Sequence, residues 1–249
     1  MVHEGAAVID IGGQSTRPLG STYGQGAVSI CAKQEMERVL PVVEAVAREL
    51  PVMISVDTTQ SEVAEAVLEK GARIINDVSC AAHPELLEVV GKSGADYVLM
   101  HSRQQGEVTE QNTQYHDVVS DVLRELGQGV ERCIQAGIAP HSIWLDPGIG
   151  FAKKAEHSVR LLANLGAFVR TGHRVVLGAS RKSFIAAVAP QANGELPPPL
   201  ERVGGTAVTV MEAVCMNVNA VRVHDVAVMW QAIQMAQALE QARGSGETC

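Results

Sequence analysis

Aromatic residues are scarce in this sequence of 249 residues, since Phe, Trp and Tyr together make up 3% of the chain. Aliphatic side chains must therefore fill the hydrophobic core. Hydrophobic residues account for 46% and charged residues for 19%, which is ordinary for a globular protein and far from a disordered composition. The length suits one (β/α) barrel or one doubly wound sheet, and we predict a single domain over residues 1–249.

Basic clusters, long apolar runs and a leader sequence are also missing. The formal net charge is −8 and no Lys/Arg run could track a phosphate backbone, so we expect no nucleic-acid partner. No apolar run reaches the roughly 18 residues that a membrane span needs, so we expect no membrane insertion. The first residues have neither the basic nor the apolar region of a secretory signal. These absences predict a soluble, cytoplasmic protein.

Cysteine is present but shows no pattern that indicates chemistry. The five cysteines are Cys31, Cys80, Cys133, Cys215 and Cys249. They are odd in number, scattered, and without CxxC or metal-ligand spacing, which suits reduced thiols in a cytoplasm. We assign none of them a chemical role.

Short apolar, β-branched runs alternate with segments of helical spacing along the whole chain. Seven such runs end near Gly12, Asp57, Asp77, His101, Asp146, Gly178 and Asp225. Helical spacing occurs in residues 60–70, 84–91, 116–136, 155–169 and 201–216. This order predicts an α/β protein with buried parallel strands.

Glycine recurs where the predicted helices end, at Gly5, Gly71, Gly94 and Gly137, and each is a plausible helix C-cap. By this pattern, residues 1–7 resemble the end of a helix that would itself follow a strand. Seven strands are readable where a closed barrel of this kind uses eight. We therefore predict a (β/α)8 TIM barrel that is N-terminally incomplete.

Nearly every predicted strand finishes with polar residues. They are Asp10, Asp57, Asn76 with Asp77, His101, Asp146, Ser180 with Arg181 and Lys182, and Arg222 with His224. The carboxyl ends of barrel strands form the face where active sites are built, so these residues predict a site there. For Asp77 or Asp225 taken alone, capping of the next helix is the favoured interpretation.

The polar residues fall into three chemical groups. The first, Asp57, Asn76, Asp146 and Lys182, offers acceptors and donors suited to a flat, nitrogen-rich heterocycle. The second, Arg17, Arg222 and His224 with the hydroxyls of Ser15 and Thr16, suits an anion, although Arg17 alone is equally a solvated loop charge. Arg222 and His224 alternate on one strand, and we expect them buried near the barrel mouth. The third consists of the glycine-containing loops 12–18, 146–151 and 178–184.

The strings GGQSTRP, ISVDT, IINDVS, VLMH, LDPGIGF, GASRKS and RVHDV resemble, in order, the motifs of dihydropteroate synthases. The resemblance covers essentially the whole chain. Related pterin-binding barrels, such as methyltetrahydrofolate methyltransferases, share the Asp/Asn/Asp set but lack the STRP, SRK and RVHD strings together. The dihydropteroate synthase family is therefore preferred, and residues 1–249 are expected to form one pterin-binding barrel domain.

The resemblance also implies a role for each matching residue. The pterin would be bound by Asp57, Asn76, Met100, Asp146, Gly178, Lys182 and Arg222, the pyrophosphate by Arg222 and His224, and p-aminobenzoate by Thr16, Arg17, Pro18, Phe151, Lys182 and Ser183. Asp57, Lys182 and Arg222 would be the catalytic residues. Sulfonamides would compete with p-aminobenzoate, and the chain would form a homodimer through its C-terminal helices. A role inside the chain's own core is equally open for the apolar residues of those helices.

The implied reaction is displacement of pyrophosphate from 6-hydroxymethyl-7,8-dihydropterin pyrophosphate by the amine of p-aminobenzoate, with Mg²⁺ as cofactor. In the family a first strand carries an Asn that helps bind Mg²⁺, and a loop carries a TPDSF-like motif; neither matches here, so the metal ligands are unknown. Two alternatives are a truncated or non-catalytic pterin-binding paralogue and a different barrel enzyme acting on a phosphorylated metabolite. The last would be favoured only if Asp57, Asn76 and Asp146 failed to converge.

Overall fold

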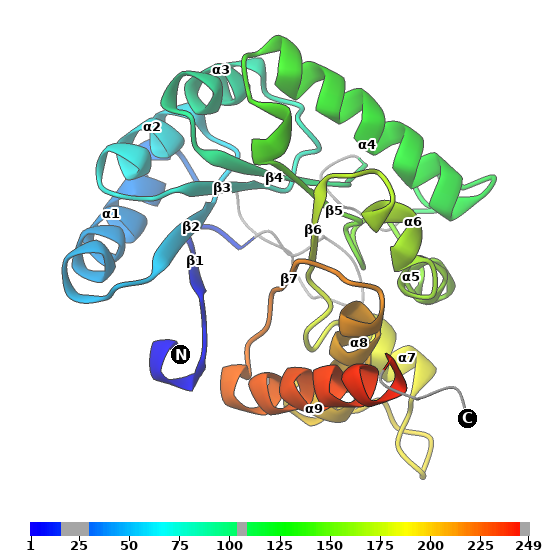
Figure 1. The fold of residues 1–249 in the computed structure, drawn as a ribbon. Helices are drawn as coiled ribbons and strands as arrows, with labels where there is room; N and C mark the ends of the chain where they lie inside the picture. The colour runs from blue at the N-terminus through cyan, green and yellow to red at the C-terminus, as the bar shows by residue number, and fades with distance from the viewer. Residues whose placement is uncertain (16–29, 104–108, 245–249) are drawn as a thin grey trace.

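The fold is a curled parallel sheet with helices on its outer side (Figure 1). The computed structural model describes residues 1–15, 30–103 and 109–244. The seven strands are β1 (Val8–Gly12), β2 (Met53–Asp57), β3 (Ile74–Asp77), β4 (Asp96–Met100), β5 (Ile143–Asp146), β6 (Arg174–Leu177) and β7 (Ala220–Val221). They are hydrogen-bonded in sequence order, and all six pairings are parallel. The predicted barrel class and its seven readable strands are confirmed.

Helices connect successive strands. They are α1 (Ala32–Glu49), α2 (Ser61–Glu69), α3 (Pro84–Ser93), α4 (Val118–Gln135), α5 (Ala155–Leu162), α6 (Leu165–Val169), α7 (Ser183–Val188), α8 (Val203–Cys215) and α9 (Val226–Gly244). Short 3-10 turns lie at η1 (Val2–Glu4), η3 (Pro140–Ser142) and η4 (Pro199–Arg202). Within the described residues, no helix combines the length and the apolar character that a membrane crossing requires.

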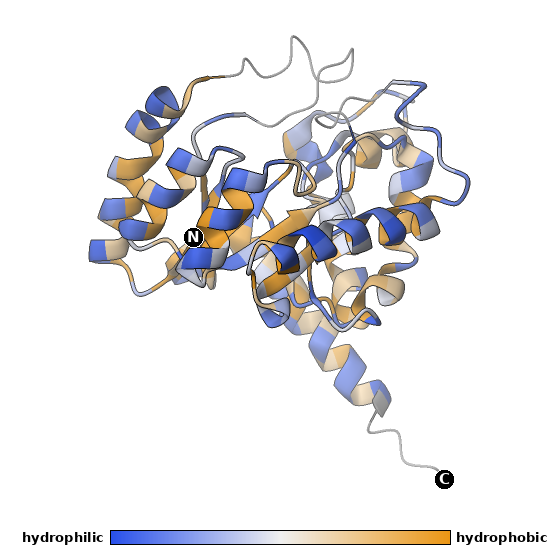
Figure 2. Ribbon diagram, turned by 90° about the horizontal axis from the view of Figure 1, so that it is seen from above, coloured by the Kyte–Doolittle hydropathy of each residue, from blue (hydrophilic) through white to orange (hydrophobic). Residues whose placement is uncertain are grey.

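Aliphatic residues fill the core, as the shortage of aromatics predicts. Val56, Ile75 and Leu99 lie in adjacent strands and are inaccessible to solvent, and Val63 and Leu126 bring the helices against them. Strands covered on both faces read as nearly continuous apolar runs, which explains the pattern seen in the sequence. Figure 2 shows the same arrangement, with apolar strands inside and polar colours on the outer sides of the helices.

The four predicted C-cap glycines all adopt positive φ angles, from 71° at Gly94 to 113° at Gly71. This left-handed conformation costs glycine little because it has no Cβ. Gly5 ends η1 in the same way, and a Cβ there would lie 2.7 Å from the Trp230 ring of α9. The first residues and the last helix therefore lie side by side, as Figure 1 also shows.

Two sequence expectations need correction. The last strand stops at Val221 rather than continuing toward Asp225, since no strand of the described residues pairs with its outer edge. The predicted helix over residues 155–169 is divided into α5 and α6 at Asn164, whose side-chain amide donates to the carbonyl of Arg160 at 2.7 Å and competes with helix hydrogen bonding.

Candidate active site

Four of the predicted pterin residues lie at the carboxyl ends of four neighbouring strands, β2 to β5. Asp57 of β2 is paired in register with Asn76 of β3, and Met100 of β4 with Asp146 of β5. All four are at least nine-tenths buried. The parallel ladder thus brings together residues that are up to 89 positions apart, as a (β/α) barrel does for its catalytic groups.

A second acid, Asp10 of β1, lies beside Asp57 and connects it to Arg222. The Arg222 Nε donates to Asp10 Oδ2 at 2.6 Å, and its Nη2 lies 3.7 Å from Asp57 Oδ2. Because β1 and β7 are the outer strands of the sheet, this guanidinium joins its two ends. The sequence showed Asp10 as a strand-end acid but gave it no role.

Burial raises the pKa of Asp57 to about 7, and the charge of Asp10 adds to this effect while Arg222 opposes it. The remaining oxygens, Asp57 Oδ1 and Asp10 Oδ1, are buried without a hydrogen-bond partner within the described part of the chain. Buried acceptors without donors are rare in folded proteins. Both carboxylates contact Arg222, so the two unpaired oxygens belong to one cluster that can still accept from a ligand donor or a cation.

Arg222 and His224 differ from the expectation that both are buried. The Arg222 side chain is 49% exposed, and His224 is exposed as well. The reason is that both follow the short edge strand β7, which no further strand covers among the described residues. His224 lies against Ser180, with its Nδ1 3.0 Å from the Ser180 Oγ. The two predicted anion-binding residues are therefore held by different partners, His224 by Ser180 and Arg222 by Asp10.

Lys182 follows β6 and points toward Asp146. A Cβ placed on Gly178 would lie 3.5 Å from Asp146 Oδ2 and 3.9 Å from Lys182 Nζ, so the glycine leaves open the space between the two charged groups. Burial raises the pKa of Asp146, and Lys182 opposes that rise. Burial also lowers the pKa of Lys182 to about 8 against the opposing pull of Asp146.

The DPGIGF loop, residues 146–151, contacts both of these charged groups. Asp146 Oδ1 accepts from the Gly148 amide at 2.7 Å, and Lys182 Nζ donates to the Ile149 carbonyl at 2.5 Å. Lys182 Nζ also lies 4.9 Å from the centre of the Phe151 ring, which is within range of a cation–π contact. Phe151 and Lys182, two of the residues predicted for p-aminobenzoate, are thus in contact.

The remaining p-aminobenzoate residues are only partly placed. Ser183 is half-buried at the first position of α7, directly after Lys182. Thr16, Arg17 and Pro18 lie outside the described residues.

Asp77 and Asp225 both contact other groups of the chain. The helix capping favoured for Asp77 alone is wrong, because the N-cap of α3 is His83. Asp77 accepts from the backbone amides of Ser79 and Ala81 and from the Tyr97 hydroxyl. Asp225 forms an ion pair with Arg181 at the start of α9. Neither carboxylate is therefore available to a ligand in this arrangement.

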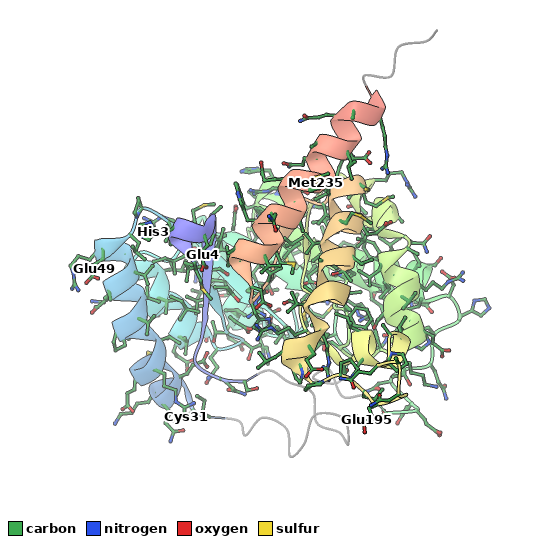
Figure 3. The ribbon with its side chains drawn as sticks, turned by 90° about the horizontal axis from the view of Figure 1, so that it is seen from below. His3, Glu4, Cys31, Glu49, Glu195 and Met235 are labelled. Atoms are coloured by element: carbon green, nitrogen blue, oxygen red, sulfur yellow. The ribbon has the colours of Figure 1, made fainter. Side chains whose placement is uncertain are left out.

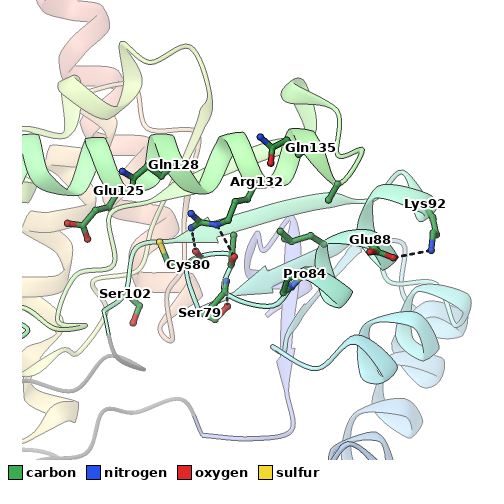
Figure 4. A pocket seen from close by; sticks show the side chains of 14 residues that line it. Ser79, Cys80, Pro84, Glu88, Lys92, Ser102, Glu125, Gln128, Arg132 and Gln135 are labelled. Carbon is green, nitrogen blue, oxygen red and sulfur yellow. Dashed lines mark hydrogen bonds and ion pairs between the residues drawn. The ribbon is translucent and has the colours of Figure 1, made fainter.

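One surface groove lies outside this row of strand-end residues. It has a volume of about 790 Å³ between α3 and α4, where Arg132 donates to the carbonyls of Cys80 and Ala81 (Figure 4). Its lining contains Ser102 and Glu125 but none of Asp57, Asn76, Asp146 and Lys182. The volume of a groove therefore does not identify the site, whereas the polar residues at the strand ends do.

Comparison with known proteins agrees with this assignment. The sequence model of the family described as "Pterin binding enzyme" matches residues 1–224. A dihydropteroate synthase of Synechocystis is 41% identical over 240 residues, which are 96% of this chain and 79% of the relative.

Solved structures give the same result. The dihydropteroate synthase of Yersinia pestis, determined with a sulfonamide drug complex, aligns with a TM-score of 0.87 at 35% identity, over 96% of this chain and 82% of that one. The enzyme of Xanthomonas albilineans with 4-aminobenzoic acid aligns with a TM-score of 0.86 at 34% identity, over 96% and 81% of the two chains. With its motifs, fold and strand-end residues in agreement, the chain belongs to the dihydropteroate synthase family of pterin-binding enzymes.

Proposed function

We propose that this protein catalyses the condensation of 6-hydroxymethyl-7,8-dihydropterin pyrophosphate with p-aminobenzoate, giving 7,8-dihydropteroate and pyrophosphate. The observation that carries the proposal is the row of Asp57, Asn76 and Asp146 on neighbouring strands, with Lys182 facing Asp146. Carboxylates accept from the ring N–H and amino groups of a pterin, while Asn and Lys donate to its ring acceptors. Met100 and Gly178 would line the same pocket.

The chemistry breaks the bond between the exocyclic methylene carbon and the pyrophosphate oxygen, and the leaving group keeps the electron pair. The resulting cation is shared with the ring, and the ionised Asp57 would stabilise it from a fixed position. The lone pair of the p-aminobenzoate nitrogen then forms the new C–N bond, and the amine loses a proton to the surrounding water. Arg222 and His224 would bind the departing pyrophosphate.

Phe151, Lys182 and Ser183 would form the p-aminobenzoate subsite together with Thr16, Arg17 and Pro18. Support comes from the contact of the Lys182 ammonium with the Phe151 ring. Because Lys182 also faces Asp146, one side chain would touch both substrates and hold them next to each other. Sulfonamides would compete at this subsite.

A Mg²⁺ ion fits the site only as an ion bound largely by the substrate. No group of three or more His, Cys, Asp or Glu residues suited to a metal occurs in the part of the chain that the structure describes. Mg²⁺ commonly uses one or two carboxylates together with substrate phosphates and water, and the buried, unpaired Asp10 Oδ1 is a suitable carboxylate oxygen. Asp10 would hold the ion, which would neutralise charge on the pyrophosphate when bound.

The pKa of Asp57 predicts how substrate binding depends on pH. With a pKa of about 7, Asp57 is mostly protonated at pH 6 and mostly ionised at pH 8. Because the ionised form accepts hydrogen bonds from the pterin, affinity should rise about tenfold from pH 6 to pH 8. Calorimetric titration with the pterin pyrophosphate measures this, and Asp57→Asn should flatten the profile. The stability of the ligand-free protein should depend on pH in the opposite direction. The raised pKa of Asp57 contributes stability to the folded state that is lost as the pH rises through 7.

We also propose a homodimer that packs through α8 and α9. Val210 and Met229 of the predicted segments are buried inside the chain, so the core interpretation holds for them. Other apolar side chains on these helices are exposed, namely Val208, Met211, Val228, Trp230, Met235 and Leu239. Met235, labelled on α9 in Figure 3, is 59% exposed. Exposed apolar patches of this kind often mark protein interfaces.

Met235→Glu should shift the protein from dimer to monomer, because a carboxylate would be buried against an apolar partner surface. Sedimentation velocity at micromolar concentration measures the change. Gln237→Glu adds the same charge to an exposed position of the same helix and should leave the dimer intact. A monomeric parent protein would contradict the proposal.

The function is tested by following pyrophosphate release with Mg²⁺ and both substrates. Release should require p-aminobenzoate, should be inhibited competitively by a sulfonamide, and should yield one dihydropteroate per pyrophosphate. Pterin binding without release would instead favour a non-catalytic pterin-binding protein. The convergence of Asp57, Asn76 and Asp146 removes the main reason to consider another barrel enzyme. A cytoplasmic location stays a prediction.

A further inference from the structure

A second lysine, Lys153, lies beneath the DPGIGF loop and has no part in the proposed chemistry. Its side chain is 3% exposed. Nζ donates to the carbonyl of Phe151 at 2.8 Å and lies 2.8 Å from His101 Nδ1. An ammonium group is costly to bury unless it is paired, so a buried lysine in this position requires a reason.

His101 and Glu125 complete the surroundings of Lys153. His101 is inaccessible to solvent, and its Nε2 lies 3.0 Å from Glu125 Oε2. Since Lys153 donates to Nδ1, the ring proton is placed on Nε2 and is donated to Glu125. Burial lowers the pKa of His101 to about 4, which keeps the ring neutral near neutral pH. The imidazole therefore links the lysine to a carboxylate, and Arg103 fixes that carboxylate from its other side.

The two lysines secure the same loop in different ways. Lys182 donates to the carbonyl of Ile149, and Lys153 donates to the carbonyl of Phe151 two residues later. Lys182 lines the proposed pocket, so a ligand that takes its hydrogen bonds would release Ile149. Lys153 is buried and donates to Phe151 from inside the chain, so its hold on Phe151 does not require a ligand.

The backbone of the first loop residue, Asp146, is held in place without Lys153, and the lysine acts on the Asp146 carboxylate only through its charge, which opposes the rise that burial causes in the pKa of that group. The carbonyl of Asp146 accepts from the His101 amide at 2.9 Å, and β5 continues the sheet on both sides. Phe151, by contrast, lies five residues beyond the last strand residue. A loss of Lys153 should consequently displace Phe151 much more than Asp146.

We propose that Lys153, held by His101 and Glu125, is a positioning residue that fixes Phe151 for the amine substrate. The proposal rests on the proposed function, because it assigns Phe151 to the p-aminobenzoate subsite. The proposal predicts different effects on the two substrates. The position of the Phe151 ring, proposed to contact the amine substrate, depends on Lys153, whereas the position of Asp146, proposed to bind the pterin, depends on the sheet. Glu125, the last member of the chain of contacts Lys153–His101–Glu125, also lines the surface groove between α3 and α4 (Figure 4).

The test compares Lys153→Met with Lys154→Met, its exposed neighbour in the chain. Lys153→Met should raise the KM for p-aminobenzoate about tenfold, since small displacements of a positioning group have large kinetic effects. The pterin dissociation constant should change by less than about threefold, and Lys154→Met should leave both values unchanged. Phe151→Ala combined with Lys153→Met should add little to either single change, because both act through one ring.

Equal weakening of pterin and p-aminobenzoate binding, or an additive double variant, would overturn the proposal. If Lys153→Met does not fold, Glu125→Gln provides the measurement, because it keeps the side-chain shape and weakens the contacts of Glu125 with His101 and Arg103 while leaving Lys153 in place. It should raise the same KM by a smaller factor, and an unchanged KM would count against the proposal. A wild-type protein that binds pterin but releases no pyrophosphate would instead refute the proposed function.

Discussion

Asp57→Asn should lower kcat/KM for pyrophosphate displacement about 10³-fold, because it removes the fixed negative charge proposed to stabilise the cation. The amide has the same shape and the side chain is 6% exposed, so the surrounding packing should be kept. Asn also removes the cost of burying a charge beside Asp10, and thermal stability should be equal to or above that of the parent. Steady-state kinetics and a melting curve measure the two effects.

Asp96→Asn is the matched control for this change. Asp96 lies at the opposite end of the sheet, where it starts β4 and accepts from Trp144 and Arg174. The substitution is the same but is remote from the strand-end site, and kcat/KM should stay within about twofold of the parent. An active Asp57→Asn variant would show that its carboxylate is not part of the chemistry.

Asp77→Ala should lower the free energy of unfolding by about 3–5 kcal/mol, because two buried donors and one partly buried donor lose their acceptor. Asp77 is inaccessible to solvent, and it accepts from two amides of the 79–81 turn and from Tyr97. In that turn Cys80 and Ala81 have φ angles of 62° and 57°, a conformation that non-glycine residues adopt only when they are held in place. Urea denaturation measures the loss.

Tyr97→Phe separates the parts of this network. It removes one of the three hydrogen bonds and leaves both turn amides paired, so it should cost only about 1–2 kcal/mol. Asp77→Ala should also shift the position of Asn76, which immediately precedes the aspartate on β3. A loss below about 1 kcal/mol in Asp77→Ala would show that the turn holds its shape without the carboxyl group.

The row of Asp57, Asn76 and Asp146 was predictable because each acid or amide directly ends an apolar run. Parallel strands in sequence order carry such ends to one face, so spacing in the sequence is sufficient. The glycine caps were predictable for a similar local reason, since a positive φ angle favours one residue type.

Contacts between distant parts of the chain could not be read in this way. The ion pair of Arg222 with Asp10 joins the two outer strands of the sheet, and no local pattern specifies which acid the arginine meets. Lys153 likewise looks like any polar residue after a motif, and only the fold shows that it is enclosed by His101 and Phe151. The exposure of Arg222 depends on β7 being an outer strand, which hydropathy does not reveal.

The central claim is that the strand-end residues both bind a pterin and displace its pyrophosphate. The most direct test mixes the protein with the pterin pyrophosphate, Mg²⁺ and isotopically labelled p-aminobenzoate, and follows labelled product and pyrophosphate in the same sample. We predict that labelled dihydropteroate accumulates over many turnovers in a 1:1 ratio with pyrophosphate, and that Asp57→Asn nearly abolishes both. Pterin binding without either product would contradict the claim.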